Sequence, residues 1–138
     1  MTATALAREA KRKDGELISY KMSNVLIPKG ALVNISAAGY AVNATDASGE
    51  TFAGVAYETV DNSAGLAGDK EIRVLTTGTF VLVDGGGNGA VTDVGAPFNI
   101  VDNQTVTDAA TTNSLKAGTC VESIDANTVR IRIDRFAS

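Results

Sequence analysis

The sequence contains no histidine, no tryptophan and a single cysteine, and these absences exclude several kinds of chemistry. Without histidine the chain lacks the commonest general base, the usual partner of a nucleophilic serine or cysteine, and the commonest metal ligand. The lone Cys120 excludes an intramolecular disulfide and is typical of a chain made in a reducing cytoplasm. No basic residue stands near it in the sequence to lower its pKa, so we interpret it as an unreactive core residue. We therefore expect a protein that is not an enzyme and that holds no metal, nucleotide or other cofactor.

Long apolar runs are also missing. No segment approaches the roughly 18 apolar residues of a membrane span, and the N-terminus lacks the apolar stretch of a secretion signal. The formal net charge is −4, from 12 basic and 16 acidic residues. Residues 1–24 hold five basic and three acidic side chains, which leaves seven basic and 13 acidic in residues 25–138. A body at −6 repels a phosphate backbone, so we expect neither nucleic acid nor a membrane as a partner.

From residue 25 onward, short apolar runs alternate with turn residues, a pattern typical of a small β-barrel or β-sandwich. The alternation is clearest where Val129, Ile131 and Ile133 are separated by arginines. The predicted strands are residues 31–35, 40–42, 52–60, 71–75, 79–83, 98–101, 105–107, 118–124 and 128–134. One helical turn over residues 64–69 is the most helix that we expect in this body. The sequence therefore predicts an all-β fold, with a flexible N-terminal arm, residues 1–24, and a single β domain, residues 25–138.

A weak internal repeat runs through the body. Residues 30–35 resemble residues 95–100, residues 52–58 resemble residues 116–122, and each half ends in an alternating arginine strand. The spacings nearly agree, because Gly30 and Gly54 are 24 positions apart and Gly95 and Gly118 are 23 apart. The repeat predicts two related β units that pack into one barrel.

The glycine-rich segment 85–90 follows a predicted apolar strand, and the spacing of its glycines formally satisfies a dinucleotide-binding fingerprint. That fingerprint acts by presenting a helix N-terminus to a pyrophosphate, and Pro97 and Gly95 leave no helix of useful length after it. The segment also fails the calcium-binding glycine repeat, because Val91 stands where an aspartate belongs. We interpret it as a loop between the two units, and the acidic residues of the chain as solvated turn and surface groups.

Read as a whole, the sequence resembles the capsid cement or head decoration proteins of tailed bacteriophages and prophages. The likeness covers nearly the full length, and it depends on the order and spacing of several segments. These segments are residues 7–13, 29–33, 39–42, 52–56, 60–65, 74–80, 93–97, 101–106 and 129–133.

The resemblance implies a compact β domain, with barrel, sandwich and tulip-like architectures all open, and no catalytic residues. It also implies a place on the outer capsid surface of the virion after synthesis in the host cytoplasm. The partners would be the major capsid protein and other copies of the chain, as trimers on the shell. From the charge pattern we expect Arg8, Lys11, Arg12 and Lys13 of the arm to contact the capsid.

A second function stays open, that of a virion-associated adhesion module that binds host glycans through polar loops. Glycan sites usually present aromatic faces, and the three tyrosines, Tyr20, Tyr40 and Tyr57, are scattered along the sequence. The sequence therefore favours the decoration protein over the adhesion module.

Overall fold

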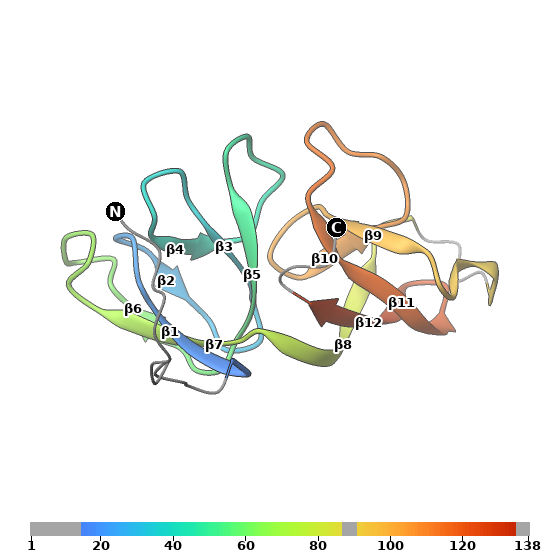
Figure 1. The fold of residues 1–138 in the computed structure, drawn as a ribbon, viewed down its shortest axis with the longest axis horizontal. Coiled ribbons are helices and arrows are strands. Elements are labelled where there is room, and N and C mark those ends of the chain that lie inside the picture. The colour runs from blue at the N-terminus through green and yellow to red at the C-terminus, as the bar shows by residue number, and fades with distance from the viewer. Residues whose placement is uncertain (1–14, 87–90, 135–138) are drawn as a thin grey trace, which may run out of the picture.

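The computed structural model describes residues 15–86 and 91–134, and this part of the chain is almost entirely β-structure (Figure 1). Its one helix is a single 3-10 turn, η1 (Val91–Asp93). The strands are β1 (Leu17–Lys21), β2 (Leu26–Ile27), β3 (Leu32–Ile35), β4 (Ala41–Asn43), β5 (Thr51–Ala56), β6 (Val60–Asp61), β7 (Glu71–Leu75), β8 (Thr77–Asp84), β9 (Pro97–Ile100), β10 (Thr105–Thr107), β11 (Lys116–Asp125) and β12 (Thr128–Asp134). The predicted all-β class is confirmed, and β7, β10 and β12 match their predicted bounds at both ends.

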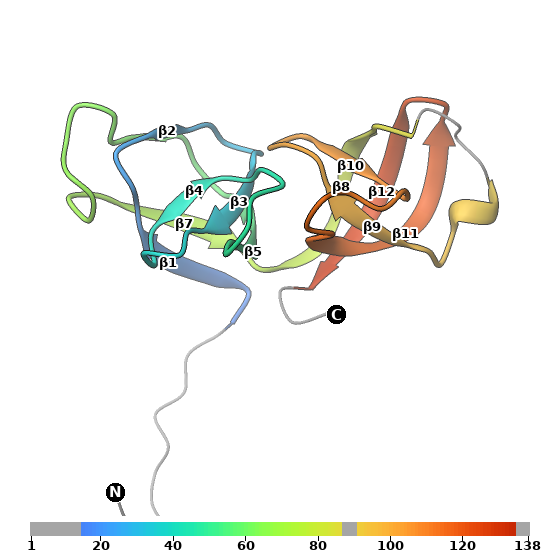
Figure 2. The same cartoon turned by 90° about the horizontal axis from the view of Figure 1, so that it is seen from above.

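The strands form two units that lie side by side along the molecule (Figures 1 and 2). The first unit is a five-stranded sheet in the order β1-β7-β5-β3-β4. The strands of the second unit follow the equivalent order, β8-β12-β11-β9-β10. This unit closes into a barrel because β10 also pairs with β8. A separate small sheet pairs β2 with β6 at the side of the first unit.

The two units differ in how they close. In the second unit β8 and β10 pair in parallel, with Val83 opposite Thr105 and Asp84 opposite Val106. In the first unit one isolated parallel bridge, between Met22 and Ala41, stands at the equivalent place. The prediction of a single barrel made from both units is therefore wrong, because the second unit closes on itself.

Backbone hydrogen bonds confirm the internal repeat. In the first unit the amide of Ala56 donates to the carbonyl of Ala31 at 2.8 Å, and in the second the amide of Cys120 donates to the carbonyl of Ala96 at 2.9 Å. The strand irregularities repeat as well. The β3–β5 pairing shifts register between Val33 and Asn34, and the equivalent β9–β11 pairing shifts next to Gly118. A shared bulge of this kind is a specific feature of strand pairing, so the two units are two versions of one fold.

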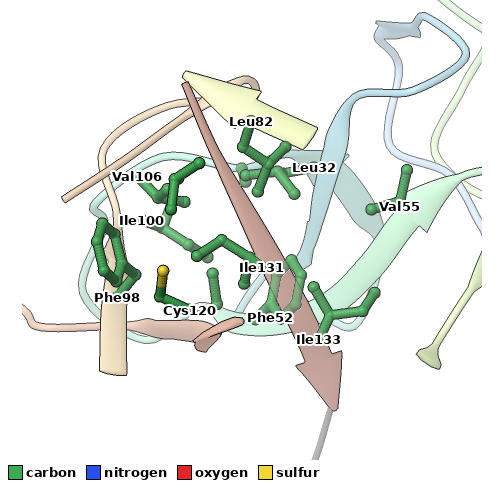
Figure 3. Close-up of a cluster of buried hydrophobic side chains, with 13 residues drawn as sticks. Leu32, Phe52, Val55, Leu82, Phe98, Ile100, Val106, Cys120, Ile131 and Ile133 are labelled. Carbon is green, nitrogen blue, oxygen red and sulfur yellow. The ribbon is translucent and has the colours of Figure 1, made fainter. Parts of the chain in front are cut away.

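A hydrophobic core joins the two units (Figure 3). It contains four buried residues of the first unit, Leu32, Ala44, Phe52 and Val55, and nine of the second, Leu82, Phe98, Ile100, Val106, Ala117, Cys120, Val129, Ile131 and Ile133. A second cluster lies within the first unit alone and includes Met22, Ile27, Val33, Ile72 and Val74. Full burial of each large side chain contributes about 1.5–3 kcal/mol, so the shared cluster fixes one unit against the other. The amide of Leu32 also donates to the carbonyl of Asn103 across the junction, at 2.8 Å.

The structure corrects the predicted boundary of the arm at residue 24. Residues 17–21 form β1, which pairs antiparallel with β7, and Met22 is fully buried in the core of the first unit. Residues 15–24 therefore belong to the folded body, and residues 1–14 lie outside the described residues. Strand β2 was not among the predicted strands. The helical turn expected over residues 64–69 is absent, because these residues form turns and bends.

Candidate functional site

The predicted capsid-binding side chains, Arg8, Lys11, Arg12 and Lys13, lie outside the residues that the structure describes. The structure does show where the chain that carries them joins the body. The hydroxyl of Thr76 donates to the carbonyl of Gly15, and the amide of Thr76 donates to the carbonyl of Glu16 at 2.9 Å. Thr76 is the residue between β7 and β8. Gly15 and Glu16 are therefore held against the connection between the two units, where the N-terminal segment joins the folded body.

Strand β1, which follows this segment directly, is an edge strand of the first unit (Figure 2). The carbonyl of Glu16 accepts a hydrogen bond from the amide of Thr76, and the amide of Met22 donates to the carbonyl of Lys70, just before and just after β1. In this antiparallel register, every second residue of β1 therefore directs its backbone hydrogen bonds to β7. Leu17 and Ser19 therefore direct their backbone N–H and C=O groups to the other side, where the described chain places no strand beside them. An edge with unpaired backbone groups is a place where an added strand gains main-chain hydrogen bonds.

A charged cluster lies beside this edge on the outer face of the first unit. Arg73, opposite Ser19 in the sheet, contacts the Glu58 carboxylate with Nε at 3.0 Å and a second guanidinium nitrogen at 3.1 Å. The Tyr57 ring stacks under the same guanidinium, with 5.0 Å from Cζ to the ring centroid. The hydrogen bonds from Arg73 lower the pKa of Glu58, and the pair raises the pKa of Arg73. The cluster presents a fixed, largely neutralised pair to solvent.

The second unit repeats this pair in a different setting. Nε of Arg130 contacts Glu122 at 3.1 Å, at the positions that the repeat equates with Arg73 and Glu58. The neighbouring strand residue there is the exposed Val81, where the first unit has Ser19. The outer face of the second unit is accordingly more apolar, with valines 81, 83, 101 and 121 all exposed.

Two features bear on enzymatic chemistry. Burial raises the pKa of the Cys120 thiol, which lies inside the barrel core, so the thiolate is disfavoured there. Among residues 15–86 and 91–134, no group of three or more histidine, cysteine, aspartate or glutamate side chains is arranged to hold a metal ion. The sequence interpretation missed one cluster, since Asp84, Asp93 and Asp108 meet at one end of the barrel that the second unit forms. Burial and these neighbours raise the pKa of Asp93.

Comparison with known proteins adds no relative, because no family model, curated protein or solved structure matches the chain. Within the described ranges, no helix has the length and apolar character needed to cross a membrane. The resemblance to decoration proteins consequently stays a prediction from the sequence.

Proposed function

We propose that this protein is a decoration protein that binds the outer surface of a tailed-bacteriophage head and stabilises the lattice of the major capsid protein. One observation carries the proposal beyond the sequence resemblance: the basic N-terminal segment leads directly into β1, whose outer edge is open at Leu17 and Ser19. A basic segment that continues into an unpaired strand edge combines electrostatic steering with a backbone docking surface.

The proposed contact has two parts with different physics. Arg8, Lys11, Arg12 and Lys13 attract acidic or carbonyl groups of the capsid protein and raise the rate of encounter. The edge of β1 then pairs with an extended segment of the capsid protein. Binding to the assembled lattice alone stabilises it by RT ln(1 + [L]/Kd) at each site, about 2.7 kcal/mol when the free concentration is 100 times Kd. Repeated over many sites, this term resists disassembly of the shell.

Electron microscopy of purified heads tests the proposal directly, because it would reveal the chain, its symmetry and its partner together. We expect copies grouped as trimers on the outer surface, with β1 facing the capsid protein. Heads that carry no density for the chain would contradict the proposal.

A truncation separates the N-terminal segment from the body. Removal of residues 1–14 leaves β1 and Met22 in place, so the shortened chain should unfold as the full chain does. Its binding to undecorated heads should fall at least tenfold, about 1.4 kcal/mol. Unchanged affinity would show that the anchor lies on the β units.

Charge reversal gives a matched pair of single variants. Lys11→Glu should weaken binding to heads, and more at low than at high salt, because exposed charges are screened. Lys29→Glu changes the net charge equally at an exposed site on the body and should leave binding nearly unchanged. Equal losses for both variants would mean that only the overall charge matters.

The adhesion module remains the alternative outcome. Tyr57 is the one exposed aromatic side chain in the described part of the sequence, and Arg73 lies over its ring. A sugar platform needs an uncovered ring face, so this arrangement does not favour glycan binding. Specific binding on a glycan array, with none to heads, would replace the proposed function.

A further inference from the structure

Two aspartates that are distant in the sequence meet at one end of the barrel that the second unit forms. Asp93 is the last residue of η1, and Asp108 directly follows β10. Asp93 is buried, with 9% of its surface exposed, whereas Asp108 is exposed. The two side chains are hydrogen-bonded to each other, so a carboxyl group inside the protein is linked to one that solvent reaches.

This hydrogen bond needs a proton. An ionised carboxylate only accepts hydrogen bonds, so two carboxyl groups can pair only when one of them is protonated and donates. Oδ2 of Asp93 is buried, and no other donor of the described residues reaches it. The contact between Asp93 and Asp108 is therefore held by a proton, and two charges at this distance repel each other.

The groups around the pair add to the cost of a second charge. Asp84, the last residue of β8, is also buried, and its Oδ1 accepts a hydrogen bond from the amide of Gly86 at 2.9 Å. A Cβ on Gly86 would lie 3.2 Å from this oxygen and 2.9 Å from Oδ1 of Asp108, so two carboxylates flank the glycine. From β11, the buried thiol of Cys120 faces the same cluster. None of these three titratable neighbours of Asp93 brings a positive charge.

The first unit offers a direct comparison, because its residues 26–28 are equivalent to η1 by the spacing of the repeat. The turns that follow agree. The amide of Ala31 donates to the carbonyl of Pro28 at 3.1 Å, and the amide of Ala96 donates to the carbonyl of Asp93 at 2.9 Å. A proline thus stands where the second unit has its buried aspartate, so the fold of a unit does not require an acid there.

The first unit also ties the equivalent segments together, but without a proton. Asn43 stands at the position of Asp108, and its Nδ2 donates to the carbonyl of Leu26 at 2.9 Å. A side-chain amide donates in this way whatever the pH. Asp108 has nearly the same shape as an asparagine, but it can donate only when it is protonated.

We propose that Asp93 and Asp108 form a proton-dependent latch, which closes this end of the barrel in acid and opens when both carboxyl groups are charged. The exposed Asp108 is the member that moves into solvent, because Asp93 is buried at the end of η1. The closed latch ties η1 to the residue after β10, as Asn43 ties the equivalent segments permanently in the first unit.

The direction of the pH effect follows from the pKa of Asp93. Burial raises this pKa above the ordinary value of 3.8, and the charge of Asp108, the hydrogen bond to it and the charge of Asp84 act in the same direction. A carboxyl group whose pKa is higher in the folded than in the unfolded protein stabilises the fold fully below the unfolded value. It loses that contribution as the pH rises through the folded value. The latch is therefore closed at pH 3.8 and opens on the way to neutral pH.

The latch acts on a short turn whose exit is already fixed. The amide of Gly95 donates to the carbonyl of Cys120, and the amide of Cys120 donates to the carbonyl of Ala96, so the chain after η1 is held to β11. Release of the latch consequently loosens the turn and leaves the strands in place. The turn carries Val91, whose side chain is 80% exposed, so the latch governs how an apolar group is presented at this end of the molecule.

Amide hydrogen exchange of the full chain, followed by NMR between about pH 4 and pH 7, tests the latch. The amides of Val94 and Ala96 are the reporters, because both donate to carbonyls of η1. We expect their protection, corrected for the intrinsic exchange rate, to fall severalfold as the pH rises. Asp108→Asn rebuilds the donor of the first unit and should keep this protection at neutral pH. Glu71→Gln, which removes an exposed carboxylate from the first unit, should behave as the wild type does.

Thermal unfolding gives a second readout and guards against a variant that merely misfolds. Other carboxylates, such as Glu58, change stability with pH in the opposite direction, so the latch is measured as the difference in melting temperature between Asp108→Asn and the wild type. This difference should favour the variant at neutral pH and vanish in acid. Asp93→Asn, whose amide can donate to Asp108, should show the same pattern. A difference that does not change with pH, or wild-type protection of Val94 and Ala96 that is equal in acid and at neutral pH, would overturn the proposal.

Discussion

Asn34 and Asn99 occupy the same position in the two units, and each fixes a loop through its side-chain amide. Nδ2 of Asn34 donates to the carbonyl of Thr45 at 3.1 Å, and Nδ2 of Asn99 donates to the carbonyl of Ala109 at 3.0 Å. The two side chains are buried, with 0% and 4% of their surface exposed. A polar residue at the same buried place in both units indicates that each unit needs this donor for its loop.

Replacement of Asn99 by alanine should therefore destabilise the protein. The loop carbonyl of Ala109 would lose its donor, at a cost of about 1–3 kcal/mol in the free energy of unfolding. Denaturant titration measures this change. Asn24→Ala, at an exposed asparagine, is the control and should alter stability by no more than about 0.5 kcal/mol. Equal stability of the two variants would show that the Asn99 hydrogen bond contributes nothing.

Gly118 tests the close approach of β11 to β12. A Cβ there would lie 2.1 Å from the carbonyl oxygen of Arg132, and that oxygen is part of the backbone and cannot rotate away. We expect Gly118→Ala to destabilise the barrel by about 1–3 kcal/mol or more, as overpacking does. Gly15→Ala is the matched control, because a Cβ there meets no atom within 4 Å. Melting temperatures that coincide for the two variants would contradict the close contact.

Much of the fold could be predicted from sequence, because most strands show a local pattern of apolar residues bounded by turn residues. Ile72 and Val74 alternate with Glu71 and Arg73, and β7 has the predicted bounds. Strand β1 was missed for a physical reason. Leu17 and Ile18 are adjacent apolar residues, so the exposed side chain of Leu17 hides the alternation. Its strand conformation depends on β7, about fifty residues away in the sequence, which no local pattern shows.

The candidate sites depend even more on long-range contacts. Asp84, Asp93 and Asp108 each end an element or directly follow one, which is where turn aspartates are ordinarily found. Only the closure of the barrel brings them together, and that closure is parallel pairing of β8 with β10. The repeat was a sequence signal that could have singled out two of them, since the residues equivalent to Asp93 and Asp108 by its spacing, Pro28 and Asn43, are uncharged.

Glu58 should titrate below its ordinary range. The hydrogen bonds from Arg73 lower the pKa of Glu58 below 4.5, so its folded pKa lies under its unfolded pKa. The contribution of the Glu58–Arg73 pair to the stability of the fold is therefore fully present above pH 4.5. It is lost as the pH falls through the pKa that Glu58 has in the folded protein. NMR titration of the side-chain carboxyl measures this shift. Arg73→Gln should move the pKa of Glu58 back toward 4.5, and an unchanged value would assign the shift to another cause.

The last prediction concerns the corrected boundary of the N-terminal segment. Removal of residues 1–24 deletes β1 and the fully buried Met22, and it leaves β7 without its outer partner. We expect this chain to lose cooperative unfolding, whereas the chain that lacks only residues 1–14 should keep it. Circular dichroism melting curves of the two truncations distinguish them.

A point substitution isolates the core contribution of that strand from its backbone pairing. Met22→Ala should lower the free energy of unfolding by about 2–5 kcal/mol, because the side chain is completely buried among Ile27, Ala41 and Ile72. Leu17→Ala is the control on the same segment, and its partly exposed side chain should cost far less. If the 1–24 deletion melted as cooperatively as the full chain, β1 would be a dispensable arm after all, and its open edge could not be part of a rigid docking surface.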